Sequence, residues 1–299
     1  MKDFAGKVAF ISGGASGLGL GIAQALGEAR MKVVIADMRQ AALTSASDML
    51  ERLGIETFAV QLDVADRVAY ARVADRVEKT FGAVHVLCNN AGIGLLGPLK
   101  DATFNDWDWV LGVNLGGVVN GLQTFLPRIR AHGQGGHVVS TASAAGLFAG
   151  AGSGIYTASK MAVVGMMECL RGELAAEHIG VSVLCPHLVR TNIHMHASMR
   201  PEHYSNAGEG RDAEAALSAA VKSMVEVGMD PLEVGRRVVK GIERNDLYIL
   251  THPEIETIIR ERFEAILAAL PHDPVDPDRL RVEAPTLHYS VYTERRAVP

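Results

Sequence analysis

The amino-acid sequence predicts an α/β fold built on a doubly wound parallel sheet. Short apolar runs alternate with longer amphipathic stretches along most of the 299 residues, as repeated strand–helix units do. Val, Ile and Leu crowd together in most of these runs, which is typical of parallel strands buried on both faces. No internal repeat or low-complexity linker divides the chain. We therefore predict one domain, in which right-handed crossovers place helices on both faces of the sheet.

The alternation places the elements in chain order. Candidate strands cover residues 8–12, 32–37, 57–63, 84–89, 137–143 and 181–186. Candidate helices cover residues 18–29, 40–53, 66–81, 104–131 and 155–178. The segment 187–229 is predicted to be a lid-like insertion, followed by a last helix and a short strand at 247–251. The domain is expected to span 1–270, and the Pro-rich, aperiodic stretch 271–299 is expected to be an irregular tail.

Composition narrows the class of partner. The chain is 48% hydrophobic with a formal net charge of −5, which argues against a nucleic-acid or anionic-membrane partner. Cys88, Cys169 and Cys185 form no CxxC pair, so we expect buried thiols in a reducing compartment and neither disulfides nor a zinc site. The first residues lack a signal-peptide pattern, and no apolar run reaches about 18 residues, so the expected location is cytoplasmic.

A glycine-rich turn follows the first candidate strand and opens the first helix. Glycines there allow a tight turn and a close approach of the backbone to a pyrophosphate at the helix N-terminus. Isolated glycines would indicate only a flexible turn, but Asp37 ends the next strand eighteen residues beyond Gly19. This combination predicts a dinucleotide-binding Rossmann fold. The residues of the turn predicted to contact the cofactor are Gly13, Ser16, Gly17, Leu18 and Gly19.

Asp37 favours NAD as the cofactor. A carboxylate at the end of the second strand can accept hydrogen bonds from an adenosine ribose and repels a 2′-phosphate. Arg39, two residues further on, could instead face the phosphate of NADP. We interpret Arg39 as a solvated residue in the first turn of the following helix, and we predict NAD.

Two further segments fit a dinucleotide that lies across the strand ends. Asp63-Val64 closes the third strand, where a carboxylate can meet an adenine amino group; a helix N-cap for the stretch that starts at Asp66 is an equal alternative. Asn90, Ala91 and Gly92 close the fourth strand. These three residues could form a plain turn, but α/β sheets bind ligands at this edge, so we predict a cofactor contact.

Tyr156 and Lys160 lie four residues apart on a predicted helix and therefore share one face. An ammonium beside a phenol favours the phenolate and lowers a pKa that starts near about 10. Tyr156 is thereby predicted to accept a proton near neutral pH. Tyr-x-x-x-Lys alone occurs on many solvated helices, so it is the nucleotide-binding pattern upstream that indicates catalysis.

Taken together, these motifs resemble those of the short-chain dehydrogenase/reductase family over about residues 5–252. They are Ser12-Gly13-x-x-x-Gly17-x-Gly19, Asn89-Asn90-Ala91-Gly92, Asn114, Ser143, Tyr156-x-x-x-Lys160 and the segment 186–191. The resemblance implies that Tyr156 is the general acid/base, that Ser143 holds the substrate oxygen, and that Lys160 binds the nicotinamide ribose. It further implies that Asn114 orders a water that connects Lys160 to solvent. Pro186, Val189 and Thr191 are implied to contact the cofactor.

Two of these assignments have competitors. Asn114 could be a polar residue in a helix interior that a neighbouring carbonyl satisfies. Ser140 and Thr141 lie close to Ser143 in the chain, and only the spacing to Tyr156 selects Ser143. One departure from the family's pattern is His187, which follows Pro186 where the family usually has glycine. Its side chain is expected to turn outward, the alternative being a substrate contact. His194 and His196 could bind a metal, but no carboxylate lies at ligand spacing, so no metal is predicted.

Several strings suggest a closer resemblance, to bacterial Cα-dehydrogenases of lignin-derived β-aryl ethers. These strings are residues 104–109, 112–118, 200–204 and 247–252. The resemblance implies NAD-dependent oxidation of a benzylic secondary alcohol to an aryl ketone. A pocket wall is expected from 144–154, and Trp107 and Trp109 are interpreted as core or interface residues. An adaptable apolar lid is expected from Met195, Met199, Tyr204, Leu217 and Met224.

Three functions compete on this evidence. We predict an NAD-dependent dehydrogenase of a bulky, benzylic secondary alcohol, with a small aromatic or hydrophobic molecule as partner. The alternatives within enzymes are an NADPH-dependent ketone reductase and a dehydrogenase of another large hydrophobic alcohol such as a steroid. A regulatory dinucleotide-binding protein without turnover is disfavoured, because all four catalytic positions hold competent residues. By resemblance we also expect a homodimer or homotetramer.

Overall fold

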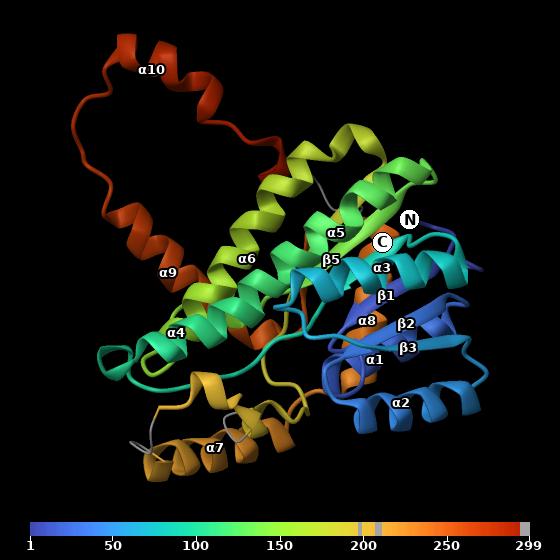
Figure 1. The fold of residues 1–299 in the computed structure, drawn as a ribbon. Coiled ribbons are helices and arrows are strands. Elements are labelled where there is room, and N and C mark those ends of the chain that lie inside the picture. Colours follow the sequence, from blue (N-terminus) through green and yellow to red (C-terminus); the bar gives the residue numbers. More distant parts are fainter. Residues whose placement is uncertain (197–198, 207–210, 294–299) are drawn as a thin grey trace.

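A parallel sheet runs through the molecule, which is described by a computed structural model (Figure 1). The structure describes residues 1–196, 199–206 and 211–293, and for 211–218 the backbone alone. Within these residues the sheet has seven strands in the order β3-β2-β1-β4-β5-β6-β7. They are β1 (Val8–Ser12), β2 (Lys32–Asp37), β3 (Thr57–Gln61), β4 (Val86–Asn89), β5 (Gly136–Thr141), β6 (Ile179–Cys185) and β7 (Tyr248–Leu250). The predicted doubly wound fold is confirmed.

Helices cover both faces of the sheet and seal two hydrophobic cores (Figure 1). One face carries α1 (Gly17–Glu28), α2 (Gln40–Arg52) and α8 (Pro231–Arg244), and the other carries α3 (Arg67–Phe81), α5 (Gly117–His132) and α6 (Gly154–Glu173). Side chains of β1 alternate between the cores: Phe10 packs with Tyr70 and Phe125 on one face, whereas Ile11 belongs to the cluster of Ile22 on the other. This two-sided burial explains the continuous apolar runs in the sequence.

The strand order determines where a ligand-binding crevice forms. The chain winds outward from β1 in one direction and from β4 in the other, so the carboxyl ends of these neighbouring strands flank a crevice. β1 pairs in parallel with β2 on one side and with β4 on the other. The loops after β1 and β4, which hold the glycine turn and Asn90-Ala91-Gly92, therefore meet at the same edge of the sheet.

The helix predicted over 104–131 is divided in the structure. α4 (Phe104–Leu111) begins with a capping box between Thr103 and Asp106, and α5 begins at Gly117. Between them Gly112–Gly116 forms a π-helical turn that contains Asn114. Three glycines in six residues, Gly112, Gly116 and Gly117, weaken the preference for regular α-helix here, and single π-turns occur often at functional sites.

The C-terminal region differs from its prediction. α9 (Glu256–Ala268) follows β7 and was not anticipated. The prediction of an irregular tail is wrong over α10 (Pro277–Glu283), where the Asp276 side chain caps the first turn by accepting from Asp278 N and Arg279 N. Pro277 at the first helical position loses no hydrogen bond by lacking an N–H. α9 and α10 extend away from the body as an arm, and the chain then returns to α6 (Figure 1).

The predicted lid segment contains one long helix, α7 (Arg211–Glu226). Residues 197–198 and 207–210 of this segment, and 294–299 of the tail, lie outside the described residues. A parallel bridge between Val189 and Met229 joins the two ends of the segment. In the described part of the chain, no helix is both long enough and apolar enough to cross a membrane.

Candidate active site

A cleft of about 770 Å³ opens along the carboxyl ends of the strands. Every residue predicted to contact the cofactor lines this cleft, and so do Ser143, Tyr156 and Lys160. Of the predicted site residues, Asn114 alone does not line it. The predicted cofactor residues that the cleft brings together are Gly13, Ser16, Gly17, Leu18, Gly19, Asp37, Asp63, Val64, Asn90, Ala91, Gly92, Tyr156, Lys160, Pro186, Val189 and Thr191.

The glycines of the turn after β1 lie where a side chain would not fit. Gly13 and Gly17 adopt φ of +65° and +51°, which residues with a Cβ rarely adopt. A Cβ on Gly19 would lie 2.1 Å from the Gly13 carbonyl oxygen. Asn90 ties the turn to β4, because its Nδ2 donates to Ser12 O at 3.0 Å. The turn is therefore a bare, fixed backbone at the N-terminus of α1, which is the geometry that a pyrophosphate requires.

Asp37 and Arg39 contact each other at the end of β2. Arg39 Nε and its backbone N each donate to Asp37 Oδ1 at 3.1 Å, and Arg39 Nη2 donates to Ser16 Oγ at 2.8 Å. The interpretation of Arg39 as a solvated first-turn residue is wrong: it is the N-cap residue of α2, and its side chain lies in the cleft. The sequence could not show this, because the contact depends on how the turn after β1 approaches the end of β2.

Asp63 and Asp66 follow β3, and the sequence left open whether Asp63 caps the next helix or contacts a ligand. Asp66 caps α3 by accepting from Val68 N and Ala69 N, both at 2.9 Å. Asp63 accepts from Ala65 N at 2.9 Å and lines the cleft. Both aspartates line the cleft, but Asp66 is engaged in the helix cap, so Asp63 is the one that we expect to meet a ligand.

Tyr156 and Lys160 lie on one face of α6, as their spacing predicts. Lys160 is 3% exposed, its Nζ donates to Thr141 O at 3.0 Å, and it lies 5.6 Å from the centroid of the Tyr156 ring. Burial lowers the pKa of Lys160 to about 8. Burial also raises the pKa of Tyr156, and a hydrogen bond with the Ser143 side chain acts in the opposite direction. In the protein alone, burial thus outweighs the expected lowering of the tyrosine pKa.

Ser143 is distinguished from its neighbours by its surroundings. Ser140 is buried in the sheet and accepts from Asn89 Nδ2 at 3.3 Å, and Thr141 Oγ1 donates to Asn90 Oδ1 at 3.3 Å. Both hydroxyls are therefore engaged within the fold. Ser143 Oγ accepts from Ala145 N at 3.2 Å and can still donate its hydrogen toward the cleft.

Asn114 is fully buried in the π-helical turn and is fixed by the backbone of Ile93. Its Oδ1 accepts from Ile93 N at 2.8 Å, and its Nδ2 donates to Ile93 O at 3.0 Å and to Ser159 Oγ at 3.1 Å. A Cβ on Gly92 would lie 3.2 Å from Asn114 Oδ1 and 3.3 Å from Lys160 Nζ. Asn114 is thus both a satisfied polar residue and a near neighbour of Lys160.

The wall of the cleft around Tyr156 is not the one expected. Residues 144–154 do not line it, since Ala144 and Gly146 turn into the core beneath α6. The wall comes instead from the loop after β4, from α4 and its π-turn, and from the segment after β6. Met199 and Tyr204 line the cleft as expected, whereas Met195 and Met224 do not, and the side chain of Leu217 lies outside the described residues. The apolar and aromatic members of the wall are Ile93, Leu95, Leu96, Trp109, Val113, Ile193, Met199, Tyr204, Val221 and Val225.

Four histidines of the segment after β6 line the cleft: His187, His194, His196 and His203. His187 is exposed, and its ring lies 5.6 Å from that of His252. His196 Nδ1 accepts from Gly94 N at 3.1 Å, and burial lowers the pKa of His196 to about 4, so the ring is neutral near pH 7. His194 lies two residues before it. No group of three or more His, Cys, Asp or Glu among the described residues is placed to hold a metal ion.

The fold and the cleft define an oxidoreductase with a Rossmann-type sheet, and comparison with known proteins gives the family. The family model described as short chain dehydrogenase matches residues 7–202. A C alpha-dehydrogenase from Sphingobium sp. (strain NBRC 103272 / SYK-6) is 42% identical over 287 residues, which cover 95% of this chain and 93% of the relative. The chain belongs to the short-chain dehydrogenase family, and its predicted resemblance to Cα-dehydrogenases is confirmed.

Solved structures of similar proteins also support membership of the short-chain dehydrogenase family. A short chain dehydrogenase/reductase from Burkholderia phymatum, solved in complex with NAD, matches with a TM-score of 0.86 at 38% identity and covers 92% of this chain and 100% of its own. The apo form of LigO from Sphingobium sp. strain SYK-6 matches with a TM-score of 0.79 at 37% identity and covers 100% of both chains.

Proposed function

We propose that this dehydrogenase uses NAD to oxidise a bulky, benzylic secondary alcohol to the aryl ketone. One observation carries the proposal: Tyr156, Lys160 and Ser143 share a single cleft with the glycine turn and with a wall of apolar and aromatic side chains. The Sphingobium relative is named a C alpha-dehydrogenase, which supports oxidation at an alcohol carbon. The resemblance to Cα-dehydrogenases of β-aryl ethers implies that this carbon lies beside an aryl group.

The choice of NAD rests on Asp37. Asp37 is 8% exposed and lies at the end of β2, where a carboxylate can accept hydrogen bonds from a ribose. The Arg39 guanidinium, which could attract a 2′-phosphate, is already paired with this carboxylate and with Ser16. The bare glycine turn fits a pyrophosphate, and the Burkholderia phymatum relative contains NAD. When bound, NAD⁺ supplies the acceptor for the hydride that leaves the alcohol carbon.

The residues of this chain would manage the proton and the oxygen. Tyr156 accepts the hydroxyl proton as the carbon–hydrogen bond breaks, and Ser143 donates to the substrate oxygen, whose charge changes during the reaction. The Lys160 ammonium favours the phenolate, and the hydrogen bond with the Ser143 side chain also acts against the rise that burial causes in the pKa of Tyr156. Asn114, held rigidly by Ile93, keeps a polar group beside Lys160. In the reverse direction each group performs the opposite transfer.

The wall chemistry indicates the substrate class. Tyr204 offers an aromatic ring, and Leu95, Val113 and Met199 offer apolar surface beside the largely buried Trp109, so an aryl group gains more here than a sugar or a small hydroxy acid. We further propose a homo-oligomer, because large apolar side chains on α9 and α10 are exposed in the single chain.

The test is a titration of the purified protein with NAD and NADP, followed by a screen of aryl secondary alcohols for absorbance of the reduced cofactor. We expect tighter binding of NAD and turnover of benzylic alcohols. Tyr156→Phe should bind NAD normally and lose about 10²-fold or more in kcat, because the proton acceptor is absent. Asp37→Ala should weaken NAD binding and bring the Kd values for NAD and NADP closer together.

Two outcomes contradict the proposal. Tighter binding of NADP by the wild type would assign Arg39 to a 2′-phosphate and favour an NADPH-dependent ketone reductase. Unchanged kcat in Tyr156→Phe would remove Tyr156 from the chemistry.

A further inference from the structure

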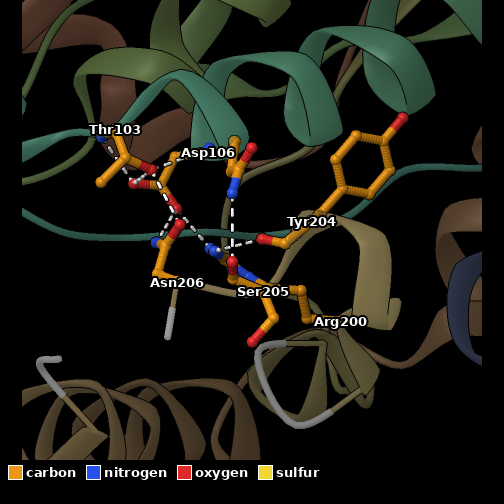
Figure 2. Close-up of polar contacts among 7 residues, drawn as sticks. Thr103, Asp106, Arg200, Tyr204, Ser205 and Asn206 are labelled. Carbon is orange, nitrogen blue, oxygen red and sulfur yellow. Dashed lines mark hydrogen bonds and ion pairs between the residues drawn. The ribbon is translucent and has the colours of Figure 1, made fainter. Parts of the chain in front are cut away.

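A polar network joins the start of α4 to the segment 199–206, which forms part of the cleft wall (Figure 2). Arg200 Nη2 donates to Asp106 Oδ1 at 2.5 Å, and Asn206 Nδ2 donates to the same oxygen at 3.0 Å. The Arg200 and Asp106 side chains are each 12% exposed, so the ion pair is shielded from water. Removing one partner of such a pair leaves a shielded charge without its counter-charge, which costs more than breaking an exposed ion pair.

Asp106 divides its two oxygens between two tasks. Its Oδ2 accepts from Thr103 N at 2.8 Å and from Thr103 Oγ1 at 2.9 Å, which completes the capping box of α4. Its Oδ1 receives both donors from the segment 199–206. The helix cap is therefore complete without Arg200, and the ion pair needs a separate explanation.

Arg200 also organises the turn that carries Tyr204. Its Nη1 donates to the Tyr204 carbonyl oxygen at 3.3 Å, and its guanidinium carbon lies 4.9 Å from the centroid of the buried Trp109 ring. Asn105 Nδ2 adds a bond to Ser205 O at 3.1 Å. Figure 2 shows the Tyr204 ring directed away from these polar contacts, and a Cβ on Gly112 would lie 3.8 Å from its hydroxyl.

Apolar packing does not hold this segment in place. Among residues 199–206 none is buried, and Met199 is 37% exposed. Met199, Pro201, His203 and Tyr204 nevertheless line the cleft. The position of this wall therefore depends on the hydrogen bonds to α4, with the Asp106–Arg200 pair at their centre.

We propose that Asp106 and Arg200 are positioning residues that set the shape of the substrate pocket and thereby select alcohols with a large aryl substituent. They act through the backbone of Tyr204 and the ring of Trp109, and need not touch the substrate. The selection of aryl alcohols rests on the function proposed above, whereas the structural role of the ion pair does not.

The structural role is tested by hydrogen exchange. The amides of Tyr204 and Ser205 donate to Pro201 O and Glu202 O at 3.0 and 2.9 Å, so they report on the order of this turn. Arg200→Met and Asp106→Asn should each increase the rate of hydrogen exchange in the peptide that contains these amides by about tenfold. The double variant should exchange little faster than either single variant, because both substitutions break the same ion pair. In Asp106→Asn the oxygen of the new side-chain amide can still accept the bonds that cap α4. The exchange rate of the Trp107 amide, which donates to Thr103 O at 3.2 Å, shows whether the start of α4 stays folded. Arg237→Met, which breaks an exposed pair with Glu233, is the matched control.

Unchanged exchange at Tyr204 and Ser205 in both single variants would overturn the proposal. Faster exchange at Trp107 in both variants, equal to that at Tyr204, would also overturn it, because loss of the helix would then explain the effect.

The selective role is tested by kinetics with a one-ring and a two-ring benzylic alcohol, 1-phenylethanol and 1,2-diphenylethanol. In Arg200→Met we expect KM for the two-ring alcohol to rise about tenfold, with KM for the one-ring alcohol, kcat and the Kd for NAD within about twofold. Equal changes for both alcohols would overturn selection by this pair. If the wild type oxidises neither alcohol, the proposed function fails, and the exchange result still decides the role of the ion pair.

Discussion

Lys160 combines a proposed catalytic role with a cost in stability. Its ammonium is buried, and desolvation lowers its pKa from 10.5 to about 8. Below pH 8 the charged form persists in the folded protein although the surroundings disfavour it. Stability is therefore lower there than it would be with an apolar side chain of similar length, a trade that active sites often show.

This predicts a pH-dependent effect of Lys160→Met. Between pH 8 and 10.5 the unfolded chain holds the lysine proton more tightly than the folded protein does, so this group makes wild-type stability rise with pH across that window. The free energy of unfolding of Lys160→Met minus that of the wild type should therefore fall by up to about 1.4 kcal/mol per pH unit between pH 8.5 and 9.5. Below about pH 7.5 the difference should be constant.

Urea unfolding at pH 7.0, 8.5 and 9.5 measures this difference, and Lys240→Met, at an exposed position of α8, is the control. A difference that stays constant from pH 7.0 to 9.5 would mean that Lys160 keeps an ordinary pKa in the folded protein.

At the scale of elements, α1 and α8 approach each other closely. A Cβ on Gly21 would lie 2.3 Å from the Pro231 carbonyl oxygen, and a Cβ on Gly235 would lie 2.3 Å from the Gly21 carbonyl oxygen. The two helix backbones thus touch. Just before α8, Arg190 Nη2 donates to Asp230 Oδ2 at 2.6 Å, and this bond ties the segment that lines the cleft to the crossing of the two helices.

Gly235→Ala should therefore destabilise the protein, although alanine favours helix over glycine. The added methyl group forces two backbones apart, and overpacking of this kind costs about 1–3 kcal/mol. Thermal unfolding should show a lower Tm for Gly235→Ala and little change for Lys240→Ala on the exposed face of the same helix. A Tm equal to that of the wild type would show that the helices can separate freely at this point.

At the scale of the whole molecule, the C-terminal arm departs from the rest of the fold. None of the residues of α9 is buried, and Phe263, Leu267 and Leu270 are 50%, 62% and 57% exposed. Beyond α10 the chain is fastened again to α6: Tyr289 OH donates to Glu168 O and Tyr292 OH to Glu168 Oε2, both at 2.9 Å. An arm that is held at both ends yet exposes large apolar side chains is typical of a surface that another copy covers.

We expect the double variant Phe263→Asp, Leu267→Asp to shift the protein to a smaller assembly, because two charges would be buried in the interface. Light scattering coupled to size-exclusion chromatography measures the mass, and Glu264→Gln on the same helix is the control. NAD binding should persist, since α9 does not line the cleft. An unchanged mass would exclude α9 from the interface.

The sequence by itself determined the sheet, its helices and most of the cofactor cleft. Strand–helix alternation depends on local periodicity, and the motifs at strand ends must meet once parallel strands share an edge. For this reason Gly13, Gly19, Asn90 and Tyr156 could be assigned to one site before any contact was known. The helix α10 in the C-terminal tail was not predicted, because its only sequence signal is the short cap Asp276-Pro277 within an otherwise aperiodic stretch.

Only the tertiary structure decided which partners these residues have. Arg39 bonds to both Asp37 and Ser16, and Ser140 is engaged within the sheet. Segments other than 144–154 form the pocket wall. All of these contacts depend on how distant loops approach one another. Asp106 and Arg200 are 94 residues apart, and no local pattern links them. The physical reason is that periodicity fixes the face of an element, whereas contacts between inserted segments follow from the shape of the whole chain.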